Sequence, residues 1–315
     1  MQFFVPAKGV SAPDFTSSTL ILPQPSLASL AQLACDLIVH NYRLELVGYL
    51  GLQDHVPAVG ARDGLPGQPD QHGVALGCEV FATPTRSLFI ALPRSPVIRA
   101  RRAHYLDSLQ RWIDESKFGE VLVVAGADAA LRGDDGLNSL TPLRHLFARP
   151  SSTTLGTRLK QISPSYLSSA PSGFQSTSEL AAQSSSSGSI PPIPHGGLTR
   201  QILTTLTSST LGDDEKPSAA SAPKIALSAL IIYTSEGAAS ESAHFLADAL
   251  AYLLEPQLAD LENRIERSSP GQGGEENVSA QGSEKGNVKW REPKSWERGL
   301  LGPELARDAG REMYG

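Results

Sequence analysis

The stretch EVLVVAGAD, residues 120–128, decides the fold. Between its acidic ends it contains only apolar side chains and one glycine. A continuous apolar run that ends in a glycine turn is typical of a β-strand covered on both faces, as in the parallel sheets of α/β proteins. A second run of the same character, residues 225–233, predicts another covered strand.

Amphipathic helices are predicted in the same half of the chain. Apolar residues recur every three or four positions in residues 27–40, which predicts a helix with Ser26 as its N-cap. The same spacing in residues 94–117 predicts a second helix, with Ser95 as the cap and Pro96 at the first helical position. Its expected buried face is made of Ile98, Tyr105, Leu106, Leu109, Trp112 and Ile113.

Further strands and a third helix complete an alternating pattern. Strand-like runs occur at residues 44–50, 74–83 and 87–92, and a helix is predicted over about residues 241–254, with Pro256 just past its end. Strands that alternate with helices, some of them apolar enough to be buried on both faces, favour one α/β domain. The predicted fold therefore has three layers, with a mostly parallel sheet flanked by helices.

Two polar segments interrupt this pattern. The first is rich in Ser, Pro and Gly and the second in Gly, Glu and Ser, so neither buries enough apolar area to offset the entropy of ordering. Beyond the second, Trp290 and Trp296 predict a short segment that docks onto the core. The predicted organisation is one domain formed by residues 1–162 and 195–266, a disordered insertion at 163–194, a disordered linker at 267–287, and a docking segment with a C-terminal tail at 288–315.

The composition argues against several functional classes. A formal net charge of −6 disfavours general nucleic-acid binding, which needs a cationic surface. No apolar stretch approaches the roughly eighteen residues of a membrane helix, and the first residues do not form a signal-peptide pattern, so we expect a protein of the cytoplasm and nucleus. Cys35 and Cys78 are then expected to be core residues without a disulfide bond.

No residue pattern predicts catalysis, a cofactor or a metal. The seven histidines lack metal-ligand spacing, and the sequence has no G-x-S-x-G, G-x-G-x-x-G or P-loop motif. One basic cluster, Arg94, Arg99, Arg101 and Arg102, fits either a site for an anion or acidic partner or a solvated helix face. The solvated face is favoured, because long cationic side chains are usually exposed.

Two glycine-containing loops are candidate ligand sites. In PHGGLTRQIL, Gly196 and Gly197 follow His195 and precede a helix-like segment, so they form either an anion cradle or a tight turn. In YTSEGAAS, Glu236 and Gly237 follow the second covered strand and form either a ligand loop or a connecting turn that Ser240 caps. The turn is the favoured interpretation in both cases.

Four blocks of sequence together resemble the proteasome assembly chaperone 2 family: residues 3–50, PHGGLTR at 194–200, YTSEGAASESAHFLADAL at 233–250 and WREPKSWERGL at 290–300. The resemblance implies a fold similar to nucleoside phosphorylases but without catalysis. It also implies a cofactor-free assembly chaperone that forms a heterodimer with a proteasome assembly chaperone 1-like protein. Such a heterodimer binds proteasome α subunits on the outer face of the α ring during core-particle assembly.

The same resemblance assigns a role to the last residues of the sequence, GREMYG. An apolar residue and a tyrosine at a chain end have nothing of their own to pack against. The family uses a C-terminal hydrophobic-tyrosine-any tail to enter pockets between α subunits, which implies that Met313, Tyr314 and Gly315 bind the partner and keep activators off unfinished particles. One departure is Ala28 and Ser29, where family members often have Gly and Asn.

Two alternatives remain open on the sequence. One is a phosphorylase-like or nucleotide-binding α/β enzyme that uses Arg94, Arg99 or the loop at His195. The other is a scaffold in which the Ser-rich insertion is the working part, so that deletion of residues 163–189 abolishes function.

Overall fold

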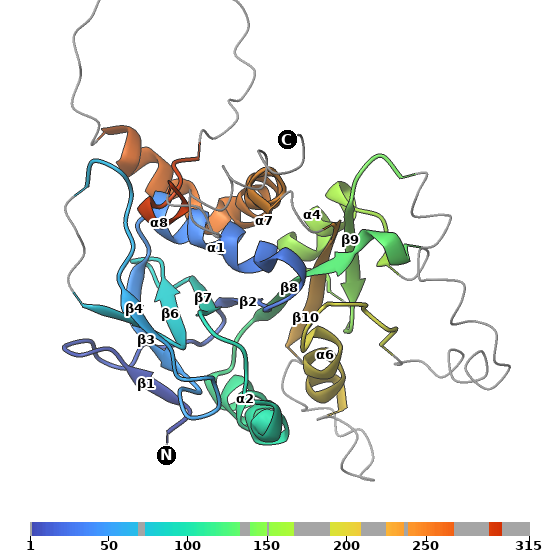
Figure 1. The fold of residues 1–315 in the computed structure, drawn as a ribbon, viewed down its shortest axis with the longest axis horizontal. Coiled ribbons are helices and arrows are strands. Elements are labelled where there is room, and N and C mark those ends of the chain that lie inside the picture. The colour runs from blue at the N-terminus through green and yellow to red at the C-terminus, as the bar shows by residue number, and fades with distance from the viewer. Residues whose placement is uncertain are drawn as a thin grey trace, which may run out of the picture.

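Eight strands form one sheet in the order β1-β3-β6-β7-β2-β8-β10-β9 in a computed structural model of the chain (Figure 1). The structure describes residues 2–68, 73–132, 139–149, 151–166, 190–208, 225–235, 239–267 and 290–297. The four central strands are parallel: β7 (Leu88–Pro93), β2 (Thr19–Pro23), β8 (Glu120–Asp128) and β10 (Ala226–Thr234). The strands on both sides of them are antiparallel: β1 (Phe4–Pro6), β3 (Glu45–Leu50), β6 (Cys78–Ala82) and β9 (Leu143–Phe147).

Both covered strands predicted from the sequence are confirmed at the centre of this sheet. β8 and β10 pair along their whole length, from Glu120 opposite Ala226 to Asp128 opposite Thr234. The neighbour of β8 on its other side, β2, was not predicted. Its sequence TLILP is too short an apolar run to distinguish a strand from another buried segment.

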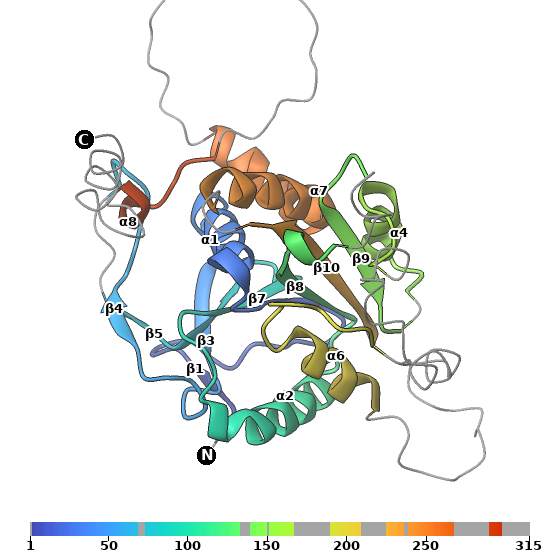
Figure 2. The ribbon, with the colours of Figure 1, turned by 45° about the vertical axis from the view of Figure 1, so that its right-hand side comes forward.

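Side chains of the central strands alternate between two cores. Leu122 and Val124 of β8 belong to the core under α1 (Leu30–Asn41), α4 (Thr154–Ile162) and α7 (Ala239–Arg267). Val121 and Val123 belong to the core under α2 (Arg102–Ser116) and α6 (Thr199–Ser208). Figure 2 shows α1 and α7 above the sheet and α2 below it. The predicted three-layer α/β fold is confirmed, and the parallel pairing lies in the middle of the sheet.

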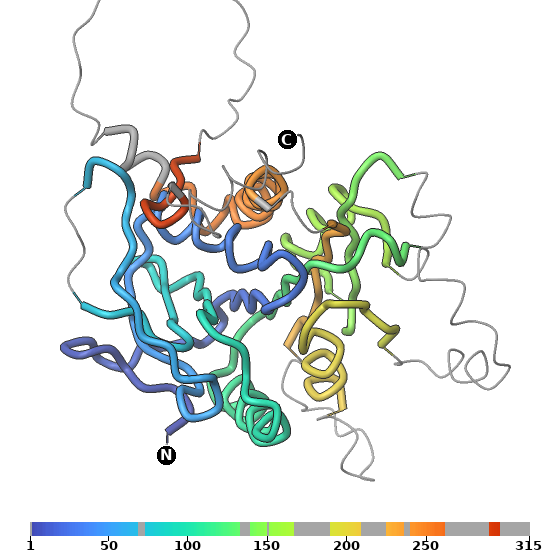
Figure 3. Tube along the Cα trace, viewed as in Figure 1, coloured from blue at the N-terminus to red at the C-terminus, as the bar shows by residue number. Residues whose placement is uncertain are grey.

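Short elements lie around this frame. Three are 3-10 helices: η1 (Leu27–Ser29), η2 (Arg99–Arg101) and η3 (Ala129–Leu131). A separate two-stranded sheet, here called the β4–β5 ribbon, consists of β4 (Val59–Ala61) and β5 (Val74–Leu76). The last described element is α8 (Lys294–Glu297). Figure 3 shows the chain returning at this point to lie near α1.

The first predicted helix is broken near its start. It begins as η1 and becomes α1 only at Leu30, because Ala28 and Ser29 have φ angles of 56° and 53°, in the left-handed region. Glycine and asparagine adopt this conformation with least strain, and the resemblance implies those two residues at these positions. The predicted capping role of Ser26 is wrong, since its hydroxyl instead accepts a hydrogen bond from the Gly126 amide at 2.8 Å.

The predicted start of the second helix is also wrong. Ser95 is buried and its hydroxyl donates to the Val56 carbonyl at 2.7 Å, so it ties two loops together and does not cap a helix. Helical structure begins only at η2 and continues as α2. Within α2 the buried side chains are Tyr105, Leu109, Trp112 and Ile113, four of the six predicted. Leu106 is only partly buried, and Ile98 is partly exposed and lies before the helix.

The third helix does not stop before Pro256, which lies inside α7. A proline within a helix loses one hydrogen bond and costs about 3 kcal/mol. The apolar stripe nevertheless continues past it, because Leu253 and Leu254 before the proline and Leu258 and Leu261 after it are buried in the same core. Tertiary packing therefore outweighs the local helix-stop signal.

The predicted disordered insertion is too wide at both ends. The His145 amide donates to the Pro164 carbonyl at 3.0 Å, and the hydroxyl of the buried Tyr166 donates to the Pro192 carbonyl at 2.8 Å. Residues 167–189, residues 268–287 of the predicted linker, and residues 288–289 and 298–315 of the predicted docking segment and tail lie outside the described residues. Within residues 290–297, Trp290 and Trp296 pack against the core under α1 and α7.

Both cysteines are buried and free, as predicted, and burial raises the pKa of each thiol. No helix among the described residues is long and apolar enough to cross a membrane.

The two-sided burial of β10 predicts a large cost for truncation at its centre. Leu230 is fully buried, so Leu230→Ala should lower the free energy of unfolding by about 2–5 kcal/mol through lost burial and a cavity. Leu140→Ala, at a fully exposed leucine, should change it by less than about 0.5 kcal/mol. Urea unfolding followed by circular dichroism measures both, and similar midpoints for the two variants would contradict the assigned burial.

Candidate functional site

The carboxyl ends of the parallel strands are the usual ligand site of an α/β fold, and here a loop lies across two of them. The loop at His195 lies across the ends of β2 and β8. The Leu27 amide donates to the His195 carbonyl at 3.2 Å, and the Asp128 amide donates to the Pro194 carbonyl at 3.3 Å. His195 Nδ1 also lies 3.2 Å from a carboxylate oxygen of Asp128.

The two glycines of this loop allow the chain to form a tight turn. Gly197 has a φ of +62°, and a Cβ there would lie 2.2 Å from the Pro25 carbonyl oxygen, so only glycine permits the close approach. The Gly196 amide donates to the Ile193 carbonyl at 3.1 Å. The geometry supports the tight-turn interpretation over an anion cradle. Glu236 and Gly237, the other candidate loop, lie outside the described residues.

The four arginines that the sequence grouped do not share one site. Arg94 donates to both carboxylate oxygens of Asp36 at 2.7 Å, and Arg101 donates to the buried Asp54 at 2.7 Å. Arg99 and Arg102 are exposed at the start of α2, in agreement with the solvated-face interpretation. The grouping was wrong for Arg94, because its distance along the chain from Asp36 hid the pairing.

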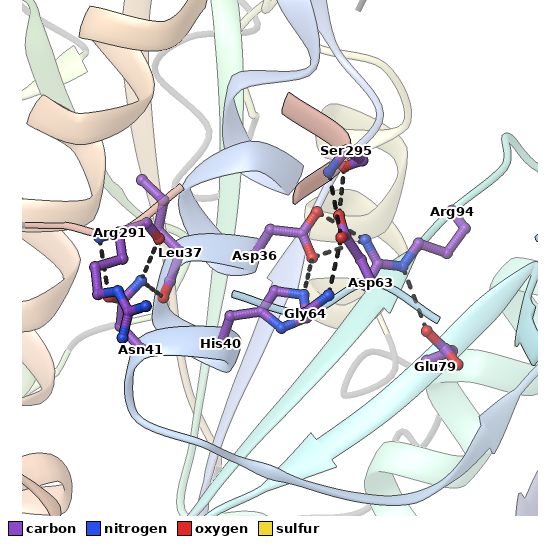
Figure 4. A network of polar contacts seen from close by, with 10 residues as sticks. All are labelled: Asp36, Leu37, His40, Asn41, Asp63, Gly64, Glu79, Arg94, Arg291 and Ser295. Carbon is purple, nitrogen blue, oxygen red and sulfur yellow. Dashed lines mark hydrogen bonds and ion pairs between the residues drawn. The ribbon is translucent and has the colours of Figure 1, made fainter. Parts of the chain in front are cut away.

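Arg94 belongs to a charged cluster, defined here as Asp36, His40, Arg62, Glu79 and Arg94. Figure 4 shows the members of this cluster other than Arg62. α1 supplies Asp36 and His40, β6 supplies Glu79, and the arginines follow β4 and β7. Glu79 lies 3.3 Å from Arg62 and 3.4 Å from Arg94, and only 2% of its side chain is exposed.

Burial and pairing compete within the charged cluster. Burial raises the pKa of Glu79, although Arg94 and Arg62 oppose the shift. Burial alone would lower the pKa of Arg94, but Asp36 and Glu79 more than compensate and raise it. Burial lowers the pKa of His40, against the opposing effect of Asp36. Arg94 therefore stays charged, and His40 is held towards its neutral form.

A cleft of about 770 Å³ opens above the charged cluster. Its floor comes from α1 and β6, and its outer wall is the β4–β5 ribbon, which stands away from the main sheet in Figure 2. Apolar and charged side chains alternate around it. The lining residues include Val39, His40, Arg43, Leu44, Gly60, Arg62, Ala75, Glu79, Phe81 and Arg94.

One rim of the cleft is held by the C-terminal strap, defined as residues 290–297. Asn41 of α1 donates to the Arg291 carbonyl at 2.9 Å and accepts from the Arg291 amide at 3.0 Å. The Lys294 amide donates to the Gly64 carbonyl at 2.9 Å, and Ser295 lines the cleft while its hydroxyl donates to Asp63. The strap thus joins α1 to the loop after β4.

The sequence analysis did not find this cleft, because five separate elements supply its residues. Two signals were present: Asp36 and His40 stand four residues apart in the first helix, and Glu79 interrupts an otherwise apolar strand. The predicted partner-binding residues Met313, Tyr314 and Gly315 lie outside the described residues. The described part of the chain contains no group of three or more His, Cys, Asp or Glu side chains placed to hold a metal.

Comparison with known proteins places this fold in a family. The model of the PAC2 family matches residues 20–260, which includes every strand of the main sheet except β1. The chain belongs to the PAC2 family. The C-terminal strap lies outside the matched residues.

Curated proteins similar to this PAC2-family chain are named proteasome assembly chaperone 2. The mouse protein is 28% identical over 159 residues, which make up 50% of this chain and 60% of the mouse protein. The human protein is 29% identical over the same length and the same shares. The match thus spans less than two thirds of these relatives.

Two solved structures from Pyrococcus furiosus are also similar to this PAC2-family chain. PbaA, described as an archaeal homolog of proteasome-assembly chaperone, has a TM-score of 0.48 and 12% identity over 81% of this chain and 87% of its own. PbaB, described as an archaeal proteasome activator, has a TM-score of 0.47 and 10% identity over 85% of this chain and 96% of its own.

The burial of His40 predicts a pH dependence of stability. Its pKa in the folded state lies below the ordinary 6.5, so its contribution to stability is present above about pH 6.5 and is lost as the pH falls towards the folded-state pKa. His40→Gln should therefore lose less stability than the unchanged chain between about pH 7.5 and 5.5, by at most about 1.4 kcal/mol per pH unit. Urea unfolding at pH 7.5 and 5.5 measures the loss of stability of each protein. Equal losses for His40→Gln and the unchanged chain would contradict the lowered pKa of His40.

Proposed function

We propose that this PAC2-family chain is a non-enzymatic proteasome assembly chaperone. The observation that carries the proposal is the family match over residues 20–260, together with relatives named proteasome assembly chaperone 2. The carboxyl ends of the parallel strands support it, because the loop at His195 lies across β2 and β8 and leaves a hollow of about 130 Å³ there, smaller than the roughly 300 Å³ of usual ligand pockets. The pairing of Arg94 with Asp36 removes one residue on which the phosphorylase-like or nucleotide-binding alternative relied.

In this proposal the chain works in the cytoplasm and nucleus as a heterodimer with a proteasome assembly chaperone 1-like protein. The heterodimer binds α subunits on the outer face of the α ring and promotes core-particle assembly without a cofactor. Support comes from the four resembling blocks of sequence, two of which the structure places in contact: Glu292 of the strap lies 3.1 Å from His244 of α7.

The proposed anchor is the segment Met313-Tyr314-Gly315. Burial of Met313 in a pocket contributes roughly 1.5–3 kcal/mol, and Tyr314 a similar amount, before the cost of ordering the tail. One tail alone binds weakly on this scale. A second contact from the partner chaperone makes the next step intramolecular, which strengthens binding by roughly 10²–10⁴-fold. The occupied pockets then exclude activators that use similar tails.

Affinity purification of the tagged full chain, followed by mass spectrometry, tests the proposed function. The expected co-purified proteins are proteasome α subunits and a second PAC2-family chain. If the chain is expressed and folded but neither α subunits nor a second PAC2-family chain co-purifies with it, the assembly role is contradicted.

Extension of the chain beyond Gly315 tests the tail separately. Three residues appended there should weaken α-ring association by about tenfold or more, because the terminal carboxylate is moved three residues away from Met313 and Tyr314. The heterodimer should remain intact. The same three residues placed before Met1 are the control. Co-purification with α subunits and with the second chaperone is quantified for both, and unchanged α-ring binding by the extended chain would defeat the tail assignment.

A further inference from the structure

The β4–β5 ribbon exposes apolar residues to solvent and does not contribute to the hydrophobic core. None of its six residues is buried, although all are apolar or glycine. Val59 is 72% exposed and Val74 is 48% exposed. An isolated two-stranded ribbon is at best marginally stable in water, and exposed apolar surface of this kind marks interaction sites.

Strand β4 contributes more of the cleft lining than strand β5. Directly paired residues share a face, so Gly60 and Ala75 form one face, and Val59, Ala61, Val74 and Leu76 form the other. All three residues of β4 line the cleft, whereas Ala75 is the only residue of β5 that does. A Cβ at Gly60 would meet no atom within 4 Å, so the space beside this face is open.

The backbone of the ribbon also has unused hydrogen-bonding capacity. Among the described residues, β4 and β5 pair only with each other, and residues 58–62 all line the cleft. Each strand of an antiparallel pair has N–H and C=O groups on its outer edge that a third strand can bond. Extended peptides bind other proteins by adding a strand to such an edge.

The floor of the cleft offers polar atoms without partners. His40 Nε2 and Glu79 Oε1 are buried and make no hydrogen bond, although Glu79 Oε1 lies 3.3 Å from Arg62 and His40 Nε2 lies 3.8 Å from Asp36. Both residues line the cleft, and both side chains are more than nine-tenths buried. Buried polar atoms of this kind are costly unless a ligand or water bonds them.

Charges of both signs line the cleft, and two of them, Arg43 and Asp63, form no ion pair with a described residue; Asp63 accepts hydrogen bonds from Ser295. The arginines of the charged cluster are paired with Asp36 and Glu79. Arg43 also lines the cleft but is exposed, and no described residue forms an ion pair with it. A carboxylate in the occupant complements Arg43, whereas a cation in the same place is repelled.

We propose that this cleft binds an extended peptide segment of another protein, with alternating apolar residues and one acidic residue opposite Arg43. The segment adds a strand to the β4–β5 ribbon, places apolar side chains against Val39, Leu44 and Phe81, and supplies hydrogen bonds to the floor. A cleft of about 770 Å³ falls within the usual range of ligand sites. This site is separate from the proposed tail anchor and does not depend on the proteasome.

An array of immobilised acetylated hexapeptides tests the proposal on the purified full chain. The peptides alternate Val and Thr and carry Asp, Lys or Gln at each position in turn. Peptides with Asp are expected to bind, with those carrying Gln weaker and those carrying Lys weakest. Binding of no peptide above background, or a preference for Lys, would overturn the proposal.

Two variants of the cleft sharpen the test on the best peptide in solution. Gly60→Val should fold, because open space surrounds that position, and should lower the affinity by about tenfold or more by filling the cleft. Arg43→Glu should weaken the Asp peptide by roughly three- to tenfold and make the Lys peptide the better ligand. Arg99→Glu, at an exposed arginine outside the cleft, is the matched control and should change nothing. Fluorescence anisotropy measures all three, and equal effects of Arg43→Glu and Arg99→Glu would reject the charge assignment.

Methylation of alternate backbone nitrogens of the same peptide separates strand addition from side-chain binding without any change to the protein. One of the two methylated registers should bind at least about tenfold more weakly, because its N–H groups face the ribbon. If both registers bind as well as the parent peptide, the added strand is refuted.

Discussion

Burial of the central strands on both faces is the constraint on which the rest of the structure depends. β8 is buried from Val121 to Ala127, and its side chains alternate between two separate cores. Each core needs its own layer of helices, so α1 and α7 cover one face while α2 and α6 cover the other. The middle of the sheet is mostly apolar and contains no charged residue between the ends of its strands, and the charges that form the cleft lie towards one side, where β6 and the end of β7 meet α1.

Ion pairs within the charged cluster offset the cost of burying charged side chains at that position. An unpaired arginine or glutamate at this depth would lose several kcal/mol of hydration. Arg94 avoids the loss by donating to both oxygens of Asp36 and sharing Glu79 with Arg62. The pairing joins α1, β6 and the end of β7, and so holds the floor of the cleft. His40 Nε2 and Glu79 Oε1, which make no hydrogen bond, belong to residues that line this cleft.

Two opposite arrangements thus occur in one domain. At the carboxyl ends of the parallel strands, where α/β enzymes bind their ligands, the loop at His195 lies across β2 and β8 and leaves only a small hollow. At the side of the sheet, a cleft remains open beside an exposed apolar ribbon. This distribution suits a PAC2-family protein whose proposed work is to bind other proteins. The C-terminal strap links the two proposed contacts in sequence, since Ser295 lines the cleft and the proposed tail anchor follows it along the chain.

The sequence by itself determined three of the four central strands (β7, β8 and β10), the periodic apolar faces of α1, α2 and α7, the buried cysteines and the packing of Trp290 and Trp296. These features depend on local periodicity or on the hydrophobicity of single residues, which can be recognised without knowing which distant residues they contact. Only the tertiary structure decided that Pro256 lies within a helix, that Ser26 bonds Gly126, and that Arg94 pairs with Asp36. Each of these depends on a partner distant along the chain or on packing that outweighs a local signal. The cleft could not be predicted from the sequence for the same reason. Five elements supply its walls, and the positions of these elements relative to one another are set only by the tertiary structure.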